Sequence, residues 1–440
     1  MNANNNIHRN HGGSTLLAVL GYLFLATGLV ATILALSSTH RKISQRQVNM
    51  EQAMFVAEGG MERGARFMES NVIAIVTSAS GATNGSGSID SGTYTYLITR
   101  TNSSTYNIVC TGTVNNVSRT VSLQRIYQPT YAEFALWSQT NGAIYFLNGE
   151  VFYGHVHADD KLYFDVNGGG PVFHAPVTSS AGTYSVQGGS ISGVTFDQGL
   201  TLNSYQGAMA DVNFNNSSIA NCLKDTATSG GLVLQGNTTI TFNGGTLSII
   251  NTRAGWSTAH TYTPPPEGII YIQNSNTGST STRAGMAYLT GGTVNGRLTI
   301  VTETNMYLQG NITYTSNPVS NPSSDDALGL ISGADVWVDT IAPNNLTINA
   351  AIMATGDFAP NDTGSFGVIN YNSGSPRGTL TIYGGIVQSL RGAVGQSSNG
   401  NPLHGYTKYY SYDPRFIDNP PPYYPVISSQ VKFSQWREGR

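Results

Sequence analysis

Three histidines and an aspartate near the start of the long C-terminal region have the types and the spacing of metal ligands. His155, His157 and Asp159 alternate along the run HVHAD, and alternate side chains of a β-strand point to one face of the sheet. His174 follows further along the chain, at about the distance that separates neighbouring turns in a fold of stacked strands. Imidazole and carboxylate groups are common zinc ligands, so these four residues are candidates for a metal site. The alternative is a polar ladder in which the imidazoles form hydrogen bonds between neighbouring strands, and we therefore assign no metal to the chain.

Acidic residues offer a second kind of chemistry. Asp325, Asp326, Asp335 and Asp339 have the composition of the paired carboxylates of a polysaccharide-cleaving enzyme. Such a site also needs a nearby Arg or Lys to make the substrate more acidic, and none lies close in sequence. We therefore expect solvated loop acids. Asp165 and the Val-Asn-Gly-Gly-Gly that follows it resemble part of a calcium loop but lack the downstream glutamate, and they predict a turn.

The sequence contains no strong catalytic signature. It lacks a Gly-x-Ser-x-Gly elbow, a phosphate-binding Gly-Lys-Ser/Thr loop, a paired CxxC motif and an HExxH helix. We therefore predict no enzyme activity, no catalytic residue and no cofactor. The net charge is −3 and Lys and Arg are not clustered. Nucleic-acid binding is disfavoured, because phosphate contacts need such clusters.

The composition predicts a mainly β protein. Only 10% of the residues are charged, far below the roughly 25% of ordinary soluble domains. The 51 glycines and 24 tyrosines, with abundant Asn, Ser and Thr, are typical of turns and strands. Cys110 and Cys222 lie in segments that we assign to different modules. Two buried small side chains are expected there, with one disulfide as the alternative.

A long helix over residues 14–76 is the element on which the rest of the chain depends. Residues 16–36 are uncharged, and about 20 residues of helix cross a bilayer core of roughly 30 Å. The apolar run is too long for a secretory signal peptide and continues into an amphipathic segment. From Ile43 to Met68 apolar side chains recur at three- and four-residue steps, which predicts one packed face and one solvated face.

The residues around this helix resemble a known family. Gly13 precedes the apolar helix, basic residues follow it, and residues 51–62 read EQAMFVAEGGME. This arrangement resembles the N-terminal segment of PilX-type proteins of type IV pilus assembly. The resemblance implies a prepilin whose 1–13 leader is removed by prepilin peptidase after Gly13, so that Ser14 becomes the N-terminus. It also implies that the helix lodges in the bacterial inner membrane and later contacts other pilin-like subunits.

Two features of the helix qualify this expectation. Major pilins have a glutamate at the fifth position after the cut, where it pairs with the N-terminal amine of a neighbouring subunit. This chain has Ala18 at that position. It is similar in this respect to PilX-type proteins and tip-located pseudopilins, which also lack the glutamate. The resemblance therefore favours a tip or priming role. Arg41, Lys42 and Arg46 follow the apolar run, whereas only Arg9 precedes it. The positive-inside rule alone would place the C-terminal side in the cytoplasm, and the resemblance implies the opposite.

Two smaller regions follow the helix. Residues 77–91 are small and polar and predict a linker. Residues 92–130 predict a small antiparallel β module, in which Asn115 and Asn116 form the turn between the last two strands. Its YNIVCTGTV and VSRTV runs are similar to the strands that follow the helix in many pilin-like exoproteins.

Residues 131–399 are a series of short β runs separated by Gly, Asn and Asp, without intervening helices. This pattern predicts a parallel β-solenoid (β-helix-like) domain in which each rung buries an apolar stripe against the next. Because no strict repeat can be written, a β-sandwich is the alternative. The expected inward positions of one rung are Leu298, Ile300, Met306, Leu308 and Ile312.

The C-terminal region carries a second resemblance. Several β runs between Gly142 and Trp436, and most distinctly GYTKYYSYDPR at 405–415, resemble an uncharacterised bacterial domain family that is found fused to PilX-like N-termini. No activity is implied by it. Residues 400–440 are rich in Tyr and Pro, and we expect a stiff segment that caps the terminal rung. A carbohydrate-binding aromatic strip is the functional alternative for this segment.

Together these features predict a non-enzymatic, pilin-like envelope protein. The helix would anchor it in the inner membrane with the C-terminal domain in the periplasm, or outside the cell on a fibre. As a minor component at the tip or in priming, it would display a β-rich head for adhesion or assembly. A simple signal-anchor helix without a pilus connection is one alternative. A membrane-anchored β-helix polysaccharide lyase or hydrolase is the other.

Overall fold

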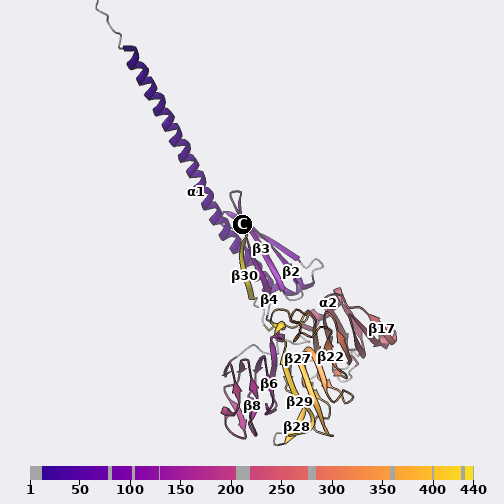
Figure 1. Ribbon diagram of the computed structural model, residues 1–440. Helices are drawn as coiled ribbons and strands as arrows, with labels where there is room; N and C mark the ends of the chain where they lie inside the picture. The colour runs from indigo at the N-terminus through magenta and orange to yellow at the C-terminus, as the bar shows by residue number, and fades with distance from the viewer. Residues whose placement is uncertain are drawn as a thin grey trace, which may run out of the picture.

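The computed structural model describes residues 12–77, 82–101, 105–127, 129–204, 219–275, 284–356, 362–398, 401–427 and 432–439. The fold is mainly β with one long N-terminal helix, α1 (Gly12–Thr77). α1 extends from the rest of the molecule as a rod, and a small sheet and a larger β body follow it (Figure 1). The helix, the small sheet and the body are contiguous parts of one molecule.

The small sheet has five antiparallel strands in the order β1 (Ala82–Ile89), β2 (Gly92–Arg100), β3 (Thr105–Val114), β4 (Val117–Tyr127) and β30 (Lys432–Gly439). The predicted turn at Asn115 and Asn116 is confirmed, with φ of 47° and 63°, the left-handed values that a two-residue hairpin needs. The last strand of the chain therefore completes a sheet that begins before residue 90.

Two segments differ from the sequence-based boundaries. Residues 82–89, expected within the 77–91 linker, form β1 instead. The rings of Tyr96 and Tyr94 occupy the space above Gly85 and Gly87, so the larger neighbours supply the packing that the small residues cannot. The 400–440 segment is not a terminal cap, because β29 (Asn401–Tyr412) lies inside the body and β30 joins the small sheet.

The body is built from parallel strands of successive chain turns. Its longest ladder pairs ten strands in parallel, in the spatial order β14 (Leu232–Gln235), β18 (Gly268–Gln273), β20 (Arg297–Thr302), β23 (Ala327–Ser332), β25 (Leu346–Ala354), β27 (Pro376–Leu390), β5 (Phe134–Thr140), β7 (His155–Ala158), β10 (Val177–Ser179) and β13 (Leu200–Thr201).

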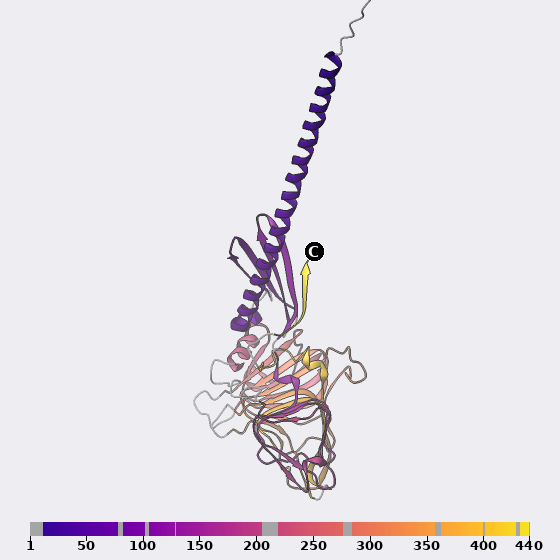
Figure 2. The ribbon, with the colours of Figure 1, turned by 90° about the vertical axis from the view of Figure 1, so that its left-hand side faces the viewer.

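Two further parallel ladders complete the turns. One contains β15 (Thr238–Gly244), β19 (Ala287–Val294), β21 (Met306–Leu308), β24 (Val336–Val338) and β26 (Phe366–Val368). The other joins β19 to β22 (Ile312–Tyr314), β25, β27, β29, β6 (Val151–Phe152), β9 (Val172–Phe173) and β12 (Thr195–Phe196). Viewed at right angles to Figure 1, the turns overlie one another (Figure 2).

Smaller elements lie at the periphery of the body. β8 (Leu162–Asp165) pairs in parallel with β11 (Tyr184–Gln187), and β28 (Gly395–Ser398) pairs antiparallel with β29. β16 (Thr246–Asn251) and β17 (Trp256–Tyr262) extend β15 as antiparallel strands. The short helix α2 (Ile219–Gly230) packs its Leu223 and Ala227 against the outer face of β18, with the 3-10 turns η1 (Tyr131–Glu133) and η5 (Pro414–Ile417) on the same face.

The spatial order of the ladder differs from the chain order. The chain enters the body beside β27 and builds turns outward through residues 129–204, here called the N-terminal stack. It then resumes at the opposite end and returns through residues 232–427, the C-terminal stack. The colours of Figure 1 accordingly run from purple to yellow and then back through orange across the body.

Entry and exit of the body lie side by side. The Tyr131 amide donates to the Pro425 carbonyl (3.0 Å) and the Ile427 amide donates to the Pro129 carbonyl (2.8 Å). The body is therefore inserted between β4 and β30 of the small sheet. This is possible because the two stacks meet at β27 and β5, which brings the two ends of the inserted segment together.

One continuous hydrophobic core fills the interior of both stacks. The five expected inward residues, Leu298, Ile300, Met306, Leu308 and Ile312, are all buried in it. Burial at about 25 cal/mol per Å² accumulates with every turn added, which explains how short strands with few charges hold together.

Candidate functional site

The N-terminal half of α1 exposes apolar side chains around its whole circumference. Residues 15–48 are all exposed, and the most apolar part of the helix has a mean hydropathy of 2.2 with none of it buried. This is long and apolar enough to cross a membrane. The Thr27 and Thr32 hydroxyls donate to the Leu23 and Gly28 carbonyls at 2.9 and 2.7 Å, so their polar groups are satisfied within the helix, as a lipid environment requires.

The C-terminal half of α1 packs on the small sheet. Ala53, Ala57 and Met61 are buried against β2, β3 and β4 in a separate hydrophobic cluster. Gly112 of β3 lies directly under the backbone of Ala53 and Ala57, where a Cβ atom would have no room. On the helix side, a Cβ on Gly60 would lie 2.7 Å from Cys110 Sγ. Small residues on both partners therefore bring the helix and the sheet into close contact.

A polar contact marks the boundary between the two halves. The Asn49 side-chain oxygen accepts hydrogen bonds from Gln45 Nε2 (3.1 Å) and from Asn115 Nδ2 (3.3 Å). The β3–β4 turn thus touches α1 where its exposed half ends. Beyond this point toward the N-terminus, the described side chains of residues 15–48 are all exposed.

The predicted processing residues lie at the beginning of α1. The helix begins at Gly12, so Gly13 and Ser14 belong to its first turn, whereas residues 1–11, with Arg9, lie outside the described parts of the chain. Ala18 lies in the exposed half. Cleavage after Gly13 stays a prediction.

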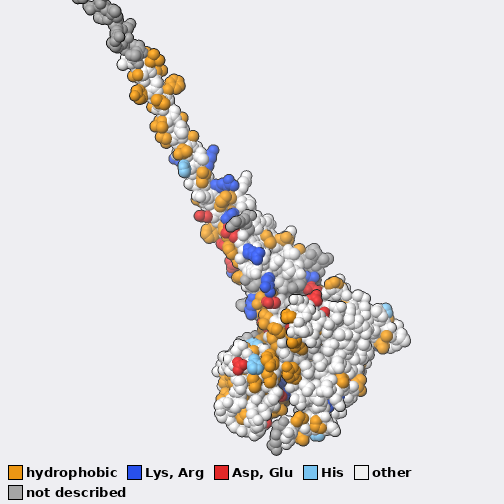
Figure 3. Space-filling view, viewed as in Figure 1, with side chains coloured by type: hydrophobic (Ala, Val, Ile, Leu, Met, Phe, Trp, Pro, Cys, Tyr) orange, Lys and Arg blue, Asp and Glu red, His pale blue; other side chains and the backbone are white. Residues whose placement is uncertain are grey.

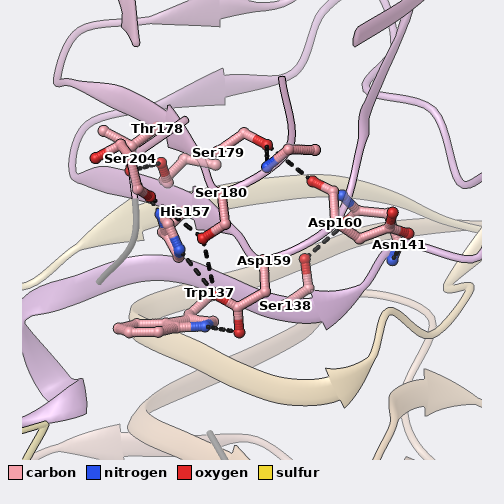
Figure 4. Close-up of polar contacts among 12 residues, drawn as sticks. Trp137, Ser138, Asn141, His157, Asp159, Asp160, Thr178, Ser179, Ser180 and Ser204 are labelled. Atoms are coloured by element: carbon pink, nitrogen blue, oxygen red, sulfur yellow. Dashed lines mark hydrogen bonds and ion pairs between the residues drawn. The ribbon is translucent and has the colours of Figure 1, made fainter. Parts of the chain in front are cut away.

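Three of the four candidate metal ligands form a hydrogen-bonded network instead, and Figure 4 shows the part around His157 and Asp159. His157 is fully buried; its Nε2 lies 3.0 Å from Asp159 Oδ1 and its Nδ1 lies 2.7 Å from the Thr178 hydroxyl. His155 Nε2 contacts the same hydroxyl at 2.8 Å, from the next position on this face of β7. Trp137 Nε1 donates to the second oxygen of Asp159 at 3.3 Å. This is the hydrogen-bonded ladder that we considered as the alternative to a metal site.

One direction in this network is fixed by chemistry. A carboxylate only accepts, so His157 Nε2 donates to Asp159. The Thr178 hydroxyl bridges His155 Nε2 and His157 Nδ1. Burial, and next the neighbouring His157, lower the pKa of His155 to about 4, so this imidazole is neutral at pH 7. A hydroxyl, an imidazole and a carboxylate in line is also the order of a nucleophilic triad, but Thr178 is buried and its hydroxyl already contacts both His155 and His157.

His174 lies apart from this network. It follows β9 on a different ladder, where its Nδ1 contacts Asp197 Oδ2 at 2.6 Å and its ring stacks on Tyr153. Among the residues that the structure describes, no three His, Cys, Asp or Glu side chains converge as metal ligands. Asp165 accepts from the Asn167 amide and from Gln187 Nε2, so both its oxygens are used in stabilising a turn.

The four aspartates proposed for polysaccharide cleavage are not brought together as a pair. Asp326 is buried and accepts from the backbone amides of Gly296 (2.6 Å) and Ser316 (2.9 Å). Asp335 is also buried and accepts from Thr363 and the Ser365 amide, and Asp339 accepts from Gln309. Asp325 lies near Arg297. No hydrogen bond or ion pair joins any two of these four described carboxylates, and three of them cross-link neighbouring turns.

A buried ionic cluster was not predicted from the sequence. Lys408 Nζ and Glu150 Oε1 lie 2.6 Å apart, with Glu150 buried and 11% of the Lys408 side chain exposed. Arg391 lies over the Phe146 ring at 3.7 Å and donates to the Ile144 carbonyl. Burial lowers the pKa of Lys408, while Glu150 acts in the opposite sense. The pair joins the N-terminal stack to the C-terminal stack. Its members are 258 residues apart, so no local pattern in the sequence announces it.

Cys110 is buried with a free thiol beneath α1, and burial raises its pKa to about 11. It therefore behaves as the small apolar residue that we expected, and not as a reactive group. The side chain of Cys222 lies outside the described residues.

No protein-family model matches the chain, and no curated protein matches it. Among solved structures, the chain is similar to the competence-associated pilin ComZ from Thermus thermophilus, with 12% sequence identity and a TM-score of 0.35. The similarity covers 89% of this chain and 97% of that one. A TM-score at this level assigns neither a fold nor a function.

Proposed function

We propose that the protein is a non-enzymatic, pilin-like component of the cell envelope, which inserts α1 in the inner membrane and then in a type IV pilus or a related filament. The observation that carries this proposal is the division of α1 into an exposed apolar half and a half packed on an antiparallel sheet. A simple anchor needs only the first half. An assembly helix needs both, because the packed half fixes the head rigidly to a rod that other helices can surround.

The rest of the structure supports the same proposal. The small sheet is completed by the last strand of the chain, so it forms a self-contained unit with α1. The body is an insertion in this unit, and we infer that it is a parallel β-solenoid, since the strands of successive turns pair in parallel from β14 to β13. Such an insertion adds a display surface without disturbing the contacts of the helix.

A minor role, at the tip or in priming, fits the residues of the exposed half. A repeated shaft subunit would offer an acid at the position of Ala18 to pair with a neighbouring N-terminal amine. An unpaired charge in an apolar assembly costs several kcal/mol. A subunit without this acid is better tolerated where it contacts fewer neighbours, as it would at the end of a filament. Prepilin peptidase, acting after Gly13, and other pilin-like subunits are the proposed partners of the helix.

The rival function, a membrane-anchored polysaccharide lyase or hydrolase, has less support. Asp326 and Asp335 are buried and bound to backbone amides, as structural residues are. Alanine replacement of Asp325, Asp326 and Asp335 would abolish polysaccharide cleavage if the rival were correct. Our proposal expects no cleavage by the parent protein to begin with.

A reporter fusion tests the orientation. Ser91 lies in the tight turn between β1 and β2, so a reporter inserted there disturbs little of the sheet. We expect a phosphatase to be active at this position and a cytoplasmic reporter to be inactive. The reverse result would place the head in the cytoplasm, as the basic residues Arg41 and Lys42 alone suggest, and would refute the proposal.

A further inference from the structure

A row of outward side chains crosses the junction between the two stacks. Tyr383 of β27 is paired with Ser411 of β29. On the next strands, Tyr410 of β29 is paired with Phe152 of β6, and Phe152 with Phe173 of β9. The residues that follow these three are Ser411, Tyr153 and His174. Because Phe152, Phe173 and Tyr410 are buried in the core, their successors point outward. The complete row is Asn349, Tyr383, Ser411, Tyr153, His174 and Asp197.

Three tyrosines of this face surround one small residue. Tyr409 lies two residues before Ser411 on β29 and also points outward, while Tyr383 and Tyr153 flank Ser411 on the neighbouring strands. Tyr153 and Tyr409 are 52% and 49% exposed, unusually open for large rings. Figure 3 shows hydrophobic side chains gathered on this face over β6, β27 and β29, with histidine and acidic side chains beside them.

Polar groups continue the row beyond the tyrosines. His174 stacks on Tyr153 with ring centroids 4.7 Å apart, and its Nδ1 is fixed by Asp197 at 2.6 Å. The imidazole is therefore held in one orientation, and its Nε2 has no hydrogen-bond partner among the described residues. Oriented hydrogen-bonding groups next to exposed ring faces are what a ligand with both C–H and O–H surfaces requires.

The charged residues of this face indicate which classes of ligand it can bind. The row and the one beside it, Thr347, Thr381, Tyr409, Val151, Val172 and Thr195, contain no Lys or Arg, and Asp197 repels anions. Nucleic acid and acidic polysaccharides would need cations here. The exposed parts of three rings offer roughly 200–350 Å², well below the ~800 Å² per partner of a stable protein interface.

We propose that Tyr153, Tyr383, Tyr409 and His174 form a binding strip for a neutral polysaccharide, whose pyranose rings stack on the tyrosines along the axis of the body. Tyr383 and Tyr153 are two strand spacings apart, about 9–10 Å, so alternate sugar rings of an extended chain can meet these two tyrosines. This inference extends the proposed function, because it names a ligand for the β-rich head that the protein would display. It does not require that the helix enters a filament.

The test uses the full-length protein in a detergent without a sugar headgroup, titrated with neutral β-1,4-linked hexasaccharides of glucose and of N-acetylglucosamine. We expect saturable binding of at least one, and binding roughly tenfold weaker or worse in the Tyr153→Ala/Tyr409→Ala variant. Ser411→Glu, which removes no ring but places a bulky acid between them, should weaken binding similarly.

The matched control is Tyr307→Ala on β21. Tyr307 is also an outward tyrosine of the body, but it is less exposed than Tyr153 and Tyr409 and lies on a different ladder, so we expect unchanged affinity. Absence of saturable binding, equal affinity in the Tyr153→Ala/Tyr409→Ala variant, or an equal loss in the control would each overturn the strip. Sugar binding is measured in solution, so an absence of binding would not change the interpretation of the reporter fusion at Ser91. A cytoplasmic result from the reporter fusion would likewise not change the measured sugar affinity.

Discussion

Replacing Gly112 by alanine should separate α1 from the small sheet. Gly112 lies under the Ala53 carbonyl and the Ala57 amide, and a Cβ atom there would be far inside van der Waals contact with both. Backbone atoms on a continuous helix cannot rotate away as a flexible side chain would. The helix or strand β3 must therefore move, and the neighbouring Cys110 must lose part of its cover.

The free-energy cost of the Gly112→Ala substitution can be estimated from other overpacked sites. Adding a methyl group to a well-packed contact typically costs 1–3 kcal/mol. About 2 kcal/mol raises the population of the opened state roughly thirtyfold. The whole of this change should be local, because the body has its own core, distinct from the cluster under α1.

Thiol labelling of Cys110 measures this opening. In a Cys222→Ser background Cys110 is the only thiol of the chain, and it is fully buried under Gly60. We expect the labelling rate to rise roughly thirtyfold in Gly112→Ala. Gly245→Ala is the control, because a Cβ there meets nothing within 4 Å. An unchanged rate in Gly112→Ala would refute the close packing of helix and sheet on which the proposed function depends.

Three further predictions concern the body. His157→Ala removes a buried imidazole with two hydrogen-bond partners and should lower the free energy of unfolding by about 3 kcal/mol, measured in urea; a loss below 1 kcal/mol would contradict the network. Lys408→Met leaves Glu150 buried without its cation and should cost about 3–5 kcal/mol, much of it recovered in Lys408→Met/Glu150→Gln; no recovery would contradict the pairing. The folded state lowers the pKa of His155 to about 4 from 6.5, so it binds fewer protons than the unfolded chain, and stability should fall as pH drops from 6.5 toward 4. His155→Gln should flatten this dependence, and an identical pH profile would refute it.

Much of the architecture could be predicted from the sequence. The apolar run, the helical spacing after it and the Asn115–Asn116 turn are local signals, and each corresponds to an element of the structure. The alternation of Leu298 and Ile300 with outward residues likewise identified core positions. Local patterns suffice wherever an element packs against its neighbours in sequence or has a dominant period.

The remaining features depend on contacts between distant segments. β1 has the composition of a linker and becomes a strand only because Tyr94 and Tyr96 cover its glycines. β30 returns from the far end of the chain to pair with β4. The order of turns in the body cannot be read from their order in the chain. His174 lies apart from the other three candidate metal ligands for the same reason, since it is on a different ladder from His155 and His157.

The most direct test of the central claim is the N-terminal mass of the full-length protein extracted from the membrane. The account predicts a mature chain that begins at Ser14 and retains the whole exposed half of α1. A chain that begins at Met1, or one cut beyond residue 36, would contradict the pilin-like assignment.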